Sequence, residues 1–469
     1  MIRNIFFVIA LLAATGTNAQ TVLPSFFTDH MVLQRQTEAS IWGTDDPKTG
    51  VTVRGSWGAE ASAKTDRDGK WSVKLKTPEA GGPYSLTISG SNEIILNDVL
   101  IGEVWFASGQ SNMEMPVKGF NNQPVTGSNE AILNGNNDQI RFFTVSRDAS
   151  LEPREDVNGA WQAATPESVM EFSATAYFFG KKIQELLDVP VGLIHSSWGG
   201  SKAEAWMDEA TLAEFPTLEI PTEITESTRL NHTPTLLYNA MLHPLIGYTL
   251  KGMIWYQGES NRLAPEQYKT LFPALINSWR AQWQQGSFPF YFVQIAPFRY
   301  EGDELAGSAY LREAQLHSML HTENTGMAVT MDIGDCGCIH PAEKKKAGER
   351  LAYWALSKDY GIKGVAFSGP VYRQMETPGD GKITLSFDHA ETGLYFSDLS
   401  ATGFEIAGED RVFVPAEVIV NRDRTLTVWS DQVPAPAAVR YAFKNCVGGT
   451  LYNTSGLPAS SFRTDNWEQ

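Results

Sequence analysis

Several residues whose side chains or amides could take part in catalysis follow apolar segments of the chain. Ser111 comes shortly after one such segment, and His340 follows another. Two glycines, Gly199 and Gly200, and the side-chain amide of Gln257 follow two more. A hydroxyl nucleophile, an imidazole base and N–H donors for an oxyanion are the parts that acyl transfer requires. These residues therefore predict an acyl-transfer site.

Each of these residues also has an ordinary structural interpretation. Ser111 begins the sequence Ser-Asn-Met-Glu, a capping box, so its hydroxyl could serve only to cap a helix. His340 precedes a proline and could lie at the start of a surface helix over residues 341–356. Ser201 is the alternative nucleophile, since it follows two glycines. His195 is the alternative base, and we expect it to be structural.

The apolar segments predict the elements that position these residues. Helical patterns separate the segments, and one of them begins after a possible Ser173 cap and ends before Pro190. Continuous apolar strands alternating with helices indicate an α/β region with a parallel sheet covered on both faces. Ligands bind such sheets beyond the carboxyl ends of the strands, where the chemical residues occur. The apolar segments are 99–107, 191–194, 253–256, 290–295 and 327–331.

The patterning predicts a leader and three further regions. Residues 1–19 contain one arginine, an apolar run and small residues at the end, which is typical of a signal peptide. Residues 20–97 alternate apolar and polar side chains, as in a small β-sandwich. Residues 98–360 form the α/β region. Residues 361–469 return to β alternation, either as a separate β domain or as one joined with the N-terminal domain.

Composition and charge exclude several classes of protein. The chain has 469 residues, 42% of them hydrophobic, and a formal net charge of −17 at pH 7. Such an acidic chain is a poor partner for nucleic acid or anionic membranes. We expect no membrane span after the leader is removed. The leader predicts export to the periplasm or the cell exterior, and the oligomeric state stays open.

The cysteine count allows one disulfide. The three cysteines are Cys336, Cys338 and Cys446, so at least one thiol has no partner within the chain. In an oxidising compartment Cys446 could pair with either Cys336 or Cys338. We predict no metal site.

Four segments together resemble the SGNH-hydrolase superfamily, and within it the sialate O-acetylesterase-like carbohydrate esterases. The resemblance implies a three-layer α/β/α, flavodoxin-like fold. It also implies an enzyme that removes O-acetyl groups from sugars without a cofactor. The segments are G-E-V-W-F-A-S-G-Q-S-N-M (102–113), S-W-G-G (197–200), I-W-Y-Q-G-E-S-N (254–261) and I-H-P (339–341).

The resemblance gives the candidate residues their roles. Ser111 matches the nucleophile, and His340 matches the general base and acid. The amides of Ser111 and Gly200 (or Gly199), with the side chain of Gln257, match the oxyanion donors. The same segments imply a set of substrate-binding residues: Gln110, Asn112, Trp198, Glu259 and Asn261.

One departure from the superfamily concerns the residue that orients the histidine. The superfamily pattern D-x-x-H places an aspartate where this chain has Gly337. Asp335 is our candidate for that role. A backbone carbonyl that supports a Ser-His dyad is the alternative.

The substrate is less constrained than the reaction. A sialic acid carries a carboxylate, so an acidic enzyme should offer it a local arginine, for which Arg229 and Arg312 are candidates. Acetyl-xylan or another neutral acetylated glycan would need no such residue. A rival of another class is a non-catalytic glycan-binding protein. A lipase or thioesterase is disfavoured, because no long aliphatic stretch follows the strand ends.

Overall fold

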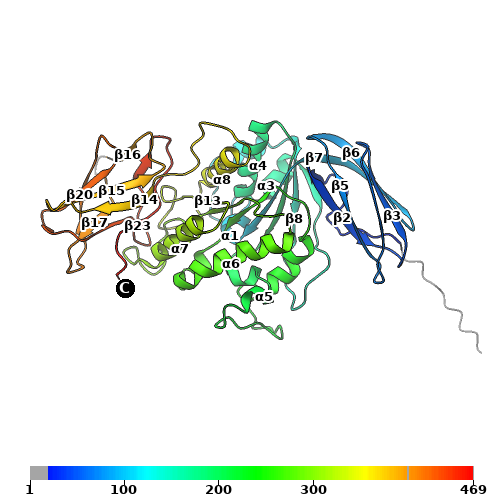
Figure 1. Cartoon of the computed structure of the whole chain (residues 1–469), viewed down its shortest axis with the longest axis horizontal. Helices are drawn as coiled ribbons and strands as arrows, with labels where there is room; N and C mark the ends of the chain where they lie inside the picture. The colour runs from blue at the N-terminus through cyan, green and yellow to red at the C-terminus, as the bar shows by residue number, and fades with distance from the viewer. Residues whose placement is uncertain (1–19, 399–400, 468–469) are drawn as a thin grey trace, which may run out of the picture.

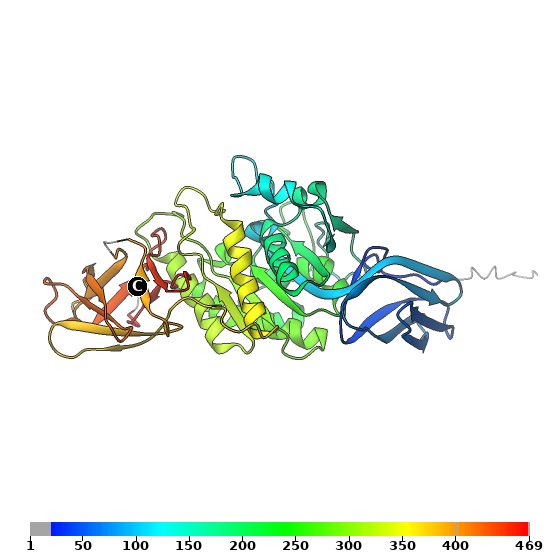
Figure 2. The ribbon, with the colours of Figure 1, turned by 90° about the horizontal axis from the view of Figure 1, so that it is seen from above.

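The computed structural model describes residues 20–398 and 401–467, so the predicted leader at residues 1–19 lies outside the described residues. Three regions follow one another along the long axis of the molecule (Figure 1). A β region near the N-terminus and a β region near the C-terminus flank a central α/β region. The two β regions lie at opposite ends in both views (Figures 1 and 2), so they form two separate units.

The centre of the molecule is a mostly parallel sheet, as the apolar segments predict. Its strand order is β13-β12-β11-β7-β10-β8-β9, and only the pairing of β8 with β9 is antiparallel. The five predicted apolar segments all contribute strands to it. The strands are β7 (Glu93–Gly109), β8 (Asn137–Thr144), β9 (Trp161–Ala164), β10 (Val191–Ser197), β11 (Gly252–Tyr256), β12 (Phe290–Val293) and β13 (Thr325–Ala328).

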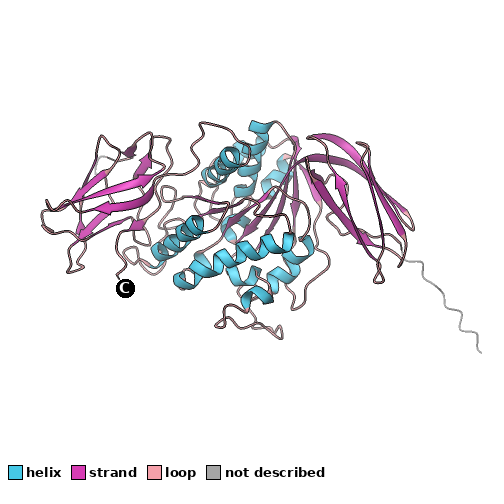
Figure 3. Ribbon diagram, in the orientation of Figure 1, coloured by secondary structure: helices cyan, strands magenta, loops and turns pink. Residues whose placement is uncertain are grey.

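Helices cover both faces of this sheet (Figure 3). Successive side chains of a strand point to opposite faces. Along β7, Val104 and Phe106 therefore pack in one hydrophobic core and Trp105 and Ala107 in another. This two-sided burial explains why the strands are continuously apolar. The cores are closed on one face by α4 (Ala174–Leu187) and α8 (Lys344–Lys358), and on the other by α6 (Pro265–Trp283) and α7 (Gly307–His321).

Two predicted helix starts can be compared with the structure. The predicted cap of α4 is confirmed, because the Ser173 hydroxyl accepts a hydrogen bond from the Ala176 amide. The predicted start of the helix after His340 is wrong, because α8 begins only at Lys344. The carbonyl of Ala342 accepts instead from the amide of Thr126, which holds this segment as a loop. The shorter helices are α1 (Ser111–Glu114), α2 (Ser128–Leu133), α3 (Pro166–Glu171) and α5 (Glu209–Leu212).

The 17-residue strand β7 belongs to two regions at once. Its first part pairs with β6 (Gly81–Ser89) and β1 (Val32–Gln34), and its second part pairs with β10 and β11. The predicted boundary between residues 97 and 98 falls inside this strand. Continuous backbone hydrogen bonding thus joins the N-terminal region to the central sheet. The other strands of the N-terminal region are β2 (Glu38–Thr44), β3 (Gly50–Gly55), β4 (Glu60–Lys64) and β5 (Lys70–Lys76).

The C-terminal region docks on the central one through a buried arginine. Arg312 on α7 is fully buried. Its guanidinium donates to the hydroxyls of Ser461 and Ser308 and to the backbone carbonyl of Lys444. Arg312 therefore serves the domain contact and is not available to a substrate carboxylate. The strands of the C-terminal region are β14 (Val371–Glu376), β15 (Lys382–Asp388), β16 (Leu394–Phe396), β17 (Phe404–Ala407), β18 (Val414–Pro415), β19 (Glu417–Val420), β20 (Leu426–Trp429), β21 (Ala438–Tyr441), β22 (Leu451–Asn453) and β23 (Phe462–Arg463).

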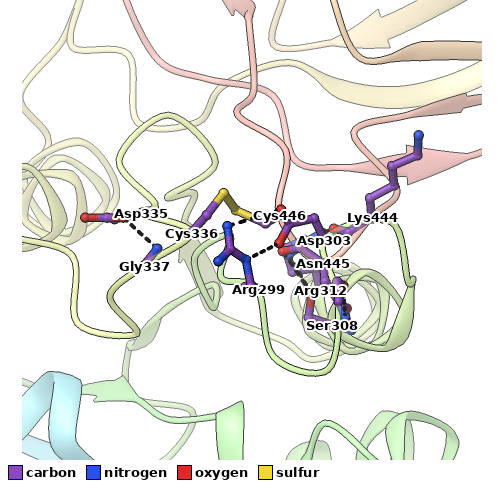
Figure 4. The surroundings of a disulfide bond; sticks show 11 residues. Arg299, Asp303, Ser308, Arg312, Asp335, Cys336, Gly337, Lys444, Asn445 and Cys446 are labelled. Atoms are coloured by element: carbon purple, nitrogen blue, oxygen red, sulfur yellow. Dashed lines mark hydrogen bonds and ion pairs between the residues drawn. A yellow bond between two sulfur atoms is a disulfide. The ribbon is translucent and has the colours of Figure 1, made fainter.

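A disulfide reinforces this contact (Figure 4). Cys446 of the C-terminal region pairs with Cys336, and Cys338 is a free thiol. The structure thus decides between the two pairings that the sequence left open. Cys336 lies in the loop that carries His340, so the disulfide ties that loop to the C-terminal region. Within residues 20–398 and 401–467, no helix is both long and apolar enough to cross a membrane.

Candidate active site

The parallel sheet brings the predicted residues to one edge. Ser111 follows β7, Gly199 and Gly200 follow β10, and Gln257 follows β11. His340 lies in the long loop between β13 and α8. β7 has β10 on one side and β11 on the other, so the strand order reverses there. Ser111 therefore lies at a topological switch point, where open α/β sheets bind their ligands.

The side chains of Ser111 and His340 are in direct contact. The Nε2 atom of His340 lies 2.8 Å from the Oγ atom of Ser111, although the two residues are 229 positions apart in the chain. Both side chains are partly buried. A hydroxyl and an imidazole at this separation can form a nucleophile–base pair.

Gly109 allows the sharp turn from β7 into α1. Its φ angle is +139°, and a Cβ atom at this position would lie 2.2 Å from the carbonyl oxygen of Tyr256. The amide of Gln110 donates to that same oxygen at 2.9 Å. Only glycine can bring the end of β7 so close to β11. This close packing of β7 against β11 places Ser111 just beyond the carboxyl end of β7.

The capping-box interpretation of Ser111 is wrong. Ser111 is the first residue of α1, and the cap position belongs to Gln110. The carboxylate of Glu114, which a capping box would turn back toward the helix start, accepts instead from the amide of Gly199 at 2.8 Å. Its other oxygen pairs with Arg147. The Ser111 hydroxyl therefore does not cap the helix and is available to His340.

A glutamine orients the histidine. The Nδ1 atom of His340 lies 2.5 Å from Oε1 of Gln123. A carbonyl oxygen can only accept, so Nδ1 carries the proton and Nε2 is free to receive one from Ser111. Asp335 is not brought to this position, because its carboxylate accepts from the amide of Gly337. In the part of the chain that the structure describes, no hydrogen bond joins Asp335 to His340.

Burial keeps His340 neutral. Desolvation, followed by the positive charge of Lys344, lowers the pKa of the imidazole to about 4. The ring of Phe120 packs edge-on against it, with ring centroids 5.3 Å apart. At neutral pH the ring is therefore unprotonated, which is the state that a general base requires.

Two backbone amides beside the nucleophile are suited to an oxyanion. A Cβ atom built on Gly199 would lie 3.4 Å from Cβ of Ser111, so the glycine turn packs directly against the nucleophile. The Gly199 amide is already bonded to Glu114, but the Gly200 amide meets no acceptor within the described residues. The Ser111 amide opens a helix and so has no intrahelical partner.

The geometry does not support a direct oxyanion contact by Gln257. This side chain is fully buried. Its Nε2 atom donates to the carbonyl of Ser201 at 3.1 Å and to Oδ1 of Asn261 at 2.6 Å. Its Oε1 atom accepts from the hydroxyl of Tyr268 at 3.0 Å. With both N–H groups engaged, Gln257 holds two loops together instead.

Most of the predicted substrate-binding side chains are buried. Trp198 alone is partly exposed, and the guanidinium of Arg147 lies 5.4 Å from its ring centroid. The other four have protein partners and support the loops of the site: Gln110, Asn112, Glu259 and Asn261. Of the predicted set, the structure leaves Trp198 for a ligand.

The alternative catalytic residues are structural. The hydroxyl of Ser201 is fully buried between the carbonyl of Gly109 and the indole N–H of Trp206. The imidazole of His195 is buried against the Ser197 hydroxyl at 2.6 Å. Residues 20–398 and 401–467 contain no group of three or more His, Cys, Asp or Glu side chains arranged to hold a metal ion.

Sequence patterns missed two side chains of this site. Gln123 follows no strand and belongs to no recognisable motif. Lys344 begins a run of three lysines that is typical of an exposed helix surface, yet it is buried. The turn residues Gly119 and Pro124 on either side of Gln123 indicate a loop, but they do not indicate what that loop contacts.

Comparison with known proteins shows the family to which the chain belongs. Residues 101–356 match a family model described as carbohydrate esterase, sialic acid-specific acetylesterase. The chain is 32% identical to the sialate O-acetylesterases of Mus musculus and Homo sapiens, over 93% of this chain and 93% and 91% of theirs. It also matches the crystal structure of a carbohydrate acetylesterase from Xanthomonas citri, with a TM-score of 0.87 and 38% identity. That match covers 96% of this chain and all of the other.

These matches and the serine–histidine pair define a carboxylic ester hydrolase that deacetylates carbohydrates. The chain belongs to the sialic acid-specific acetylesterase family of carbohydrate esterases. The similarity reaches beyond the α/β region into both flanking β regions, because it covers almost the whole chain.

Proposed function

We propose that Ser111 and His340 remove O-acetyl groups from sugars through an acetyl-enzyme, on a three-layer scaffold of the SGNH-hydrolase type. The contact of 2.8 Å between Oγ and Nε2 at the switch point of the sheet carries this proposal. The layering is supported by helices on both faces of a parallel sheet, with separate hydrophobic cores above and below it.

Acylation uses the neutral imidazole. Oγ of Ser111 attacks the acetyl carbonyl carbon while its proton passes to Nε2 of His340. The oxyanion accepts hydrogen bonds from the amides of Ser111 and Gly200. Gln123 holds the Nδ1 proton and stabilises the ring as it becomes charged. Nε2 then gives its proton to the sugar oxygen as the ester bond breaks, leaving acetyl-Ser111 and the free sugar hydroxyl.

Deacylation repeats these steps with water. His340 takes a proton from a water molecule, whose oxygen attacks the acetyl carbon of acetyl-Ser111. The same two amides stabilise the second oxyanion. The proton on Nε2 then returns to Oγ as the bond between Ser111 and the acetyl group breaks, which releases acetate and restores the resting pair.

An O-acetylated sialic acid is the substrate that we propose, in keeping with the names of the relatives. Its carboxylate needs a cation in a chain of net charge −17. His232, hydrogen-bonded to the backbone of Gly200, has its pKa lowered by burial and then by the charges of Arg229 and Lys202. Because their charges act on a histidine that contacts Gly200, Arg229 and Lys202 both lie near the proposed oxyanion site. Of these two cations, Arg229 is exposed to solvent.

We also propose export to the periplasm or the cell exterior. The bond between Cys336 and Cys446 supports an oxidising compartment, because structural disulfides persist there.

Acetate release from O-acetylated sialic acid and from acetyl-xylan tests the proposal. Ser111→Ala should lower the rate of acetate release by several orders of magnitude, because the nucleophile and base act as a unit. Ser146→Ala, an exposed serine, is the control. Arg229→Ala should raise KM for the sialic acid ester while leaving p-nitrophenyl acetate unaffected.

Two results would contradict these assignments. Acetate release by Ser111→Ala at the wild-type rate would overturn the catalytic one. Faster release from acetyl-xylan than from the sialic acid ester would move the substrate to neutral glycans.

A further inference from the structure

Behind Ser111 and His340 lies a buried polar cluster that takes no part in the proton transfers. It consists of Lys344, Asn112 and Glu259, which are 1%, 1% and 4% exposed. Charged side chains are rarely buried this deeply, because removing an ion from water is costly unless it is paired and hydrogen-bonded. A buried base and a buried acid beside a catalytic site therefore need a structural explanation.

Asn112 connects the two charges. Its Oδ1 atom accepts a hydrogen bond from Nζ of Lys344 at 2.5 Å, and its Nδ2 atom donates to Oε1 of Glu259 at 2.6 Å. One side-chain amide thus accepts from a basic group with its oxygen and donates to an acidic group with its nitrogen. Asn112 is also the residue that follows the nucleophile, so the cluster is anchored to the turn that positions Ser111.

The cluster also holds the backbone on both sides of the base. Nδ2 of Asn112 donates to the carbonyl of Ile339 at 3.1 Å, and Nζ of Lys344 donates to the carbonyl of Pro341 at 2.9 Å. These are the two residues that flank His340. We infer that Lys344, Asn112 and Glu259 are positioning residues that fix His340 against Ser111. The inference deepens the proposed function and rests on it.

The positive charge of Lys344 should affect the pH dependence of catalysis, because it influences the titration of His340. Burial lowers the pKa of Lys344 to about 7, while the nearby Glu259 carboxylate and the Cys338 thiol favour its protonated form. Its Nζ atom also lies 5.7 Å from the ring centroid of Tyr256. Where His340 titrates, near its pKa of about 4, the lysine is therefore charged and opposes protonation of the imidazole. The other side chains in contact with that imidazole, from Ser111, Gln123 and Phe120, are uncharged.

Lys344→Met tests the inference, because methionine retains an apolar stem of similar length without the charge or the donors. With p-nitrophenyl acetate as substrate we expect kcat to fall about 10²-fold and KM to change little, as for a small misplacement of catalytic groups. We also expect the acid limb of kcat/KM to move to higher pH, because His340 loses an opposing charge. Lys345→Met, a solvent-exposed neighbour on the same helix, should match the wild type in both measurements.

Asn112→Ala separates positioning from charge. It removes the bridge but retains the lysine charge, so kcat should fall while the acid limb stays in place. The double variant Asn112→Ala/Lys344→Met should lose no more in kcat than the worse single variant, because the residues act as one unit. If Lys344→Met does not fold, Asn112→Ala decides the question, with melting temperatures measured for every variant.

Three outcomes would overturn the inference. They are wild-type kcat in Asn112→Ala, wild-type kcat and acid limb in Lys344→Met, or losses in the two variants that simply add. An inactive wild-type protein would instead contradict the proposed function, so the two failures can be told apart.

Discussion

Replacing Gln123 by alanine should slow acylation by removing the partner that supports His340 as it becomes charged. The bond from Nδ1 to Oε1 joins two neutral groups in the resting enzyme and becomes charge-assisted when Nε2 takes the serine proton. The turn that carries Gln123 should survive the substitution, because its backbone is paired with Phe120 in both directions at 3.0 Å. The substitution should therefore destabilise the transition state of acylation more than it destabilises the folded protein.

The size of the effect follows from the change in the strength of this bond. A hydrogen bond between neutral partners contributes about 0.5–1.5 kcal/mol, and one to a charged group about 1.5–3 kcal/mol. The transition state thus loses about 1–1.5 kcal/mol more than the resting enzyme. This difference corresponds to a decrease in kcat/KM of about 5- to 13-fold.

Gln123→Glu provides the opposite perturbation at the same position. A carboxylate beside Nδ1 favours the charged imidazole, so the pKa of His340 should rise above its value of about 4. In the wild type kcat/KM should fall only as the pH approaches about 4, because the base must be unprotonated. In Gln123→Glu this fall should begin at higher pH, with no loss of activity at neutral pH.

The assay is kcat/KM for p-nitrophenyl acetate measured across the pH range in which each variant stays folded. Asn121→Ala, an exposed position of the same loop, is the matched control. Wild-type activity in Gln123→Ala would refute the orienting role of this residue. An acid limb that moves to lower pH in Gln123→Glu would refute the electrostatic reasoning.

Two further predictions concern groups that support the site. Gln257→Ala should lower the melting temperature, because each buried partner left without a hydrogen bond costs about 1–3 kcal/mol. A loss of about 10²–10³ in kcat at unchanged melting temperature would instead show that its amide reaches the oxyanion. Cys446→Ser should cost about 2–5 kcal/mol of stability, seen by thermal unfolding, and should lower kcat because the disulfide steadies the loop of His340. Cys338→Ser, which leaves the disulfide intact, is the control, and unchanged kcat in Cys446→Ser would separate the bond from catalysis.

Local sequence patterns predicted the scaffold well. The continuous apolar segments became buried parallel strands, and the cap at Ser173 is present. The same local reasoning failed at Ser111, whose capping-box sequence does not form a capping box. It also failed for the helix after His340, which begins only at Lys344. In both places contacts with distant loops take the groups that a local pattern would have used.

Sequence patterns alone predicted that a hydroxyl, two glycines, a side-chain amide and an imidazole would follow strand ends at one edge of a sheet. This is possible because strand period, turn residues and motifs are encoded within a few consecutive positions. The folded structure was needed to show that Gln123 contacts His340, 217 residues further along the chain, and that Cys336 and not Cys338 binds Cys446. The same holds for Lys344, which is buried although its two lysine neighbours are exposed. These partners depend on how loops pack against one another. Contacts between distant loops are not encoded by a repeating local pattern of residues, so sequence periodicity cannot predict them.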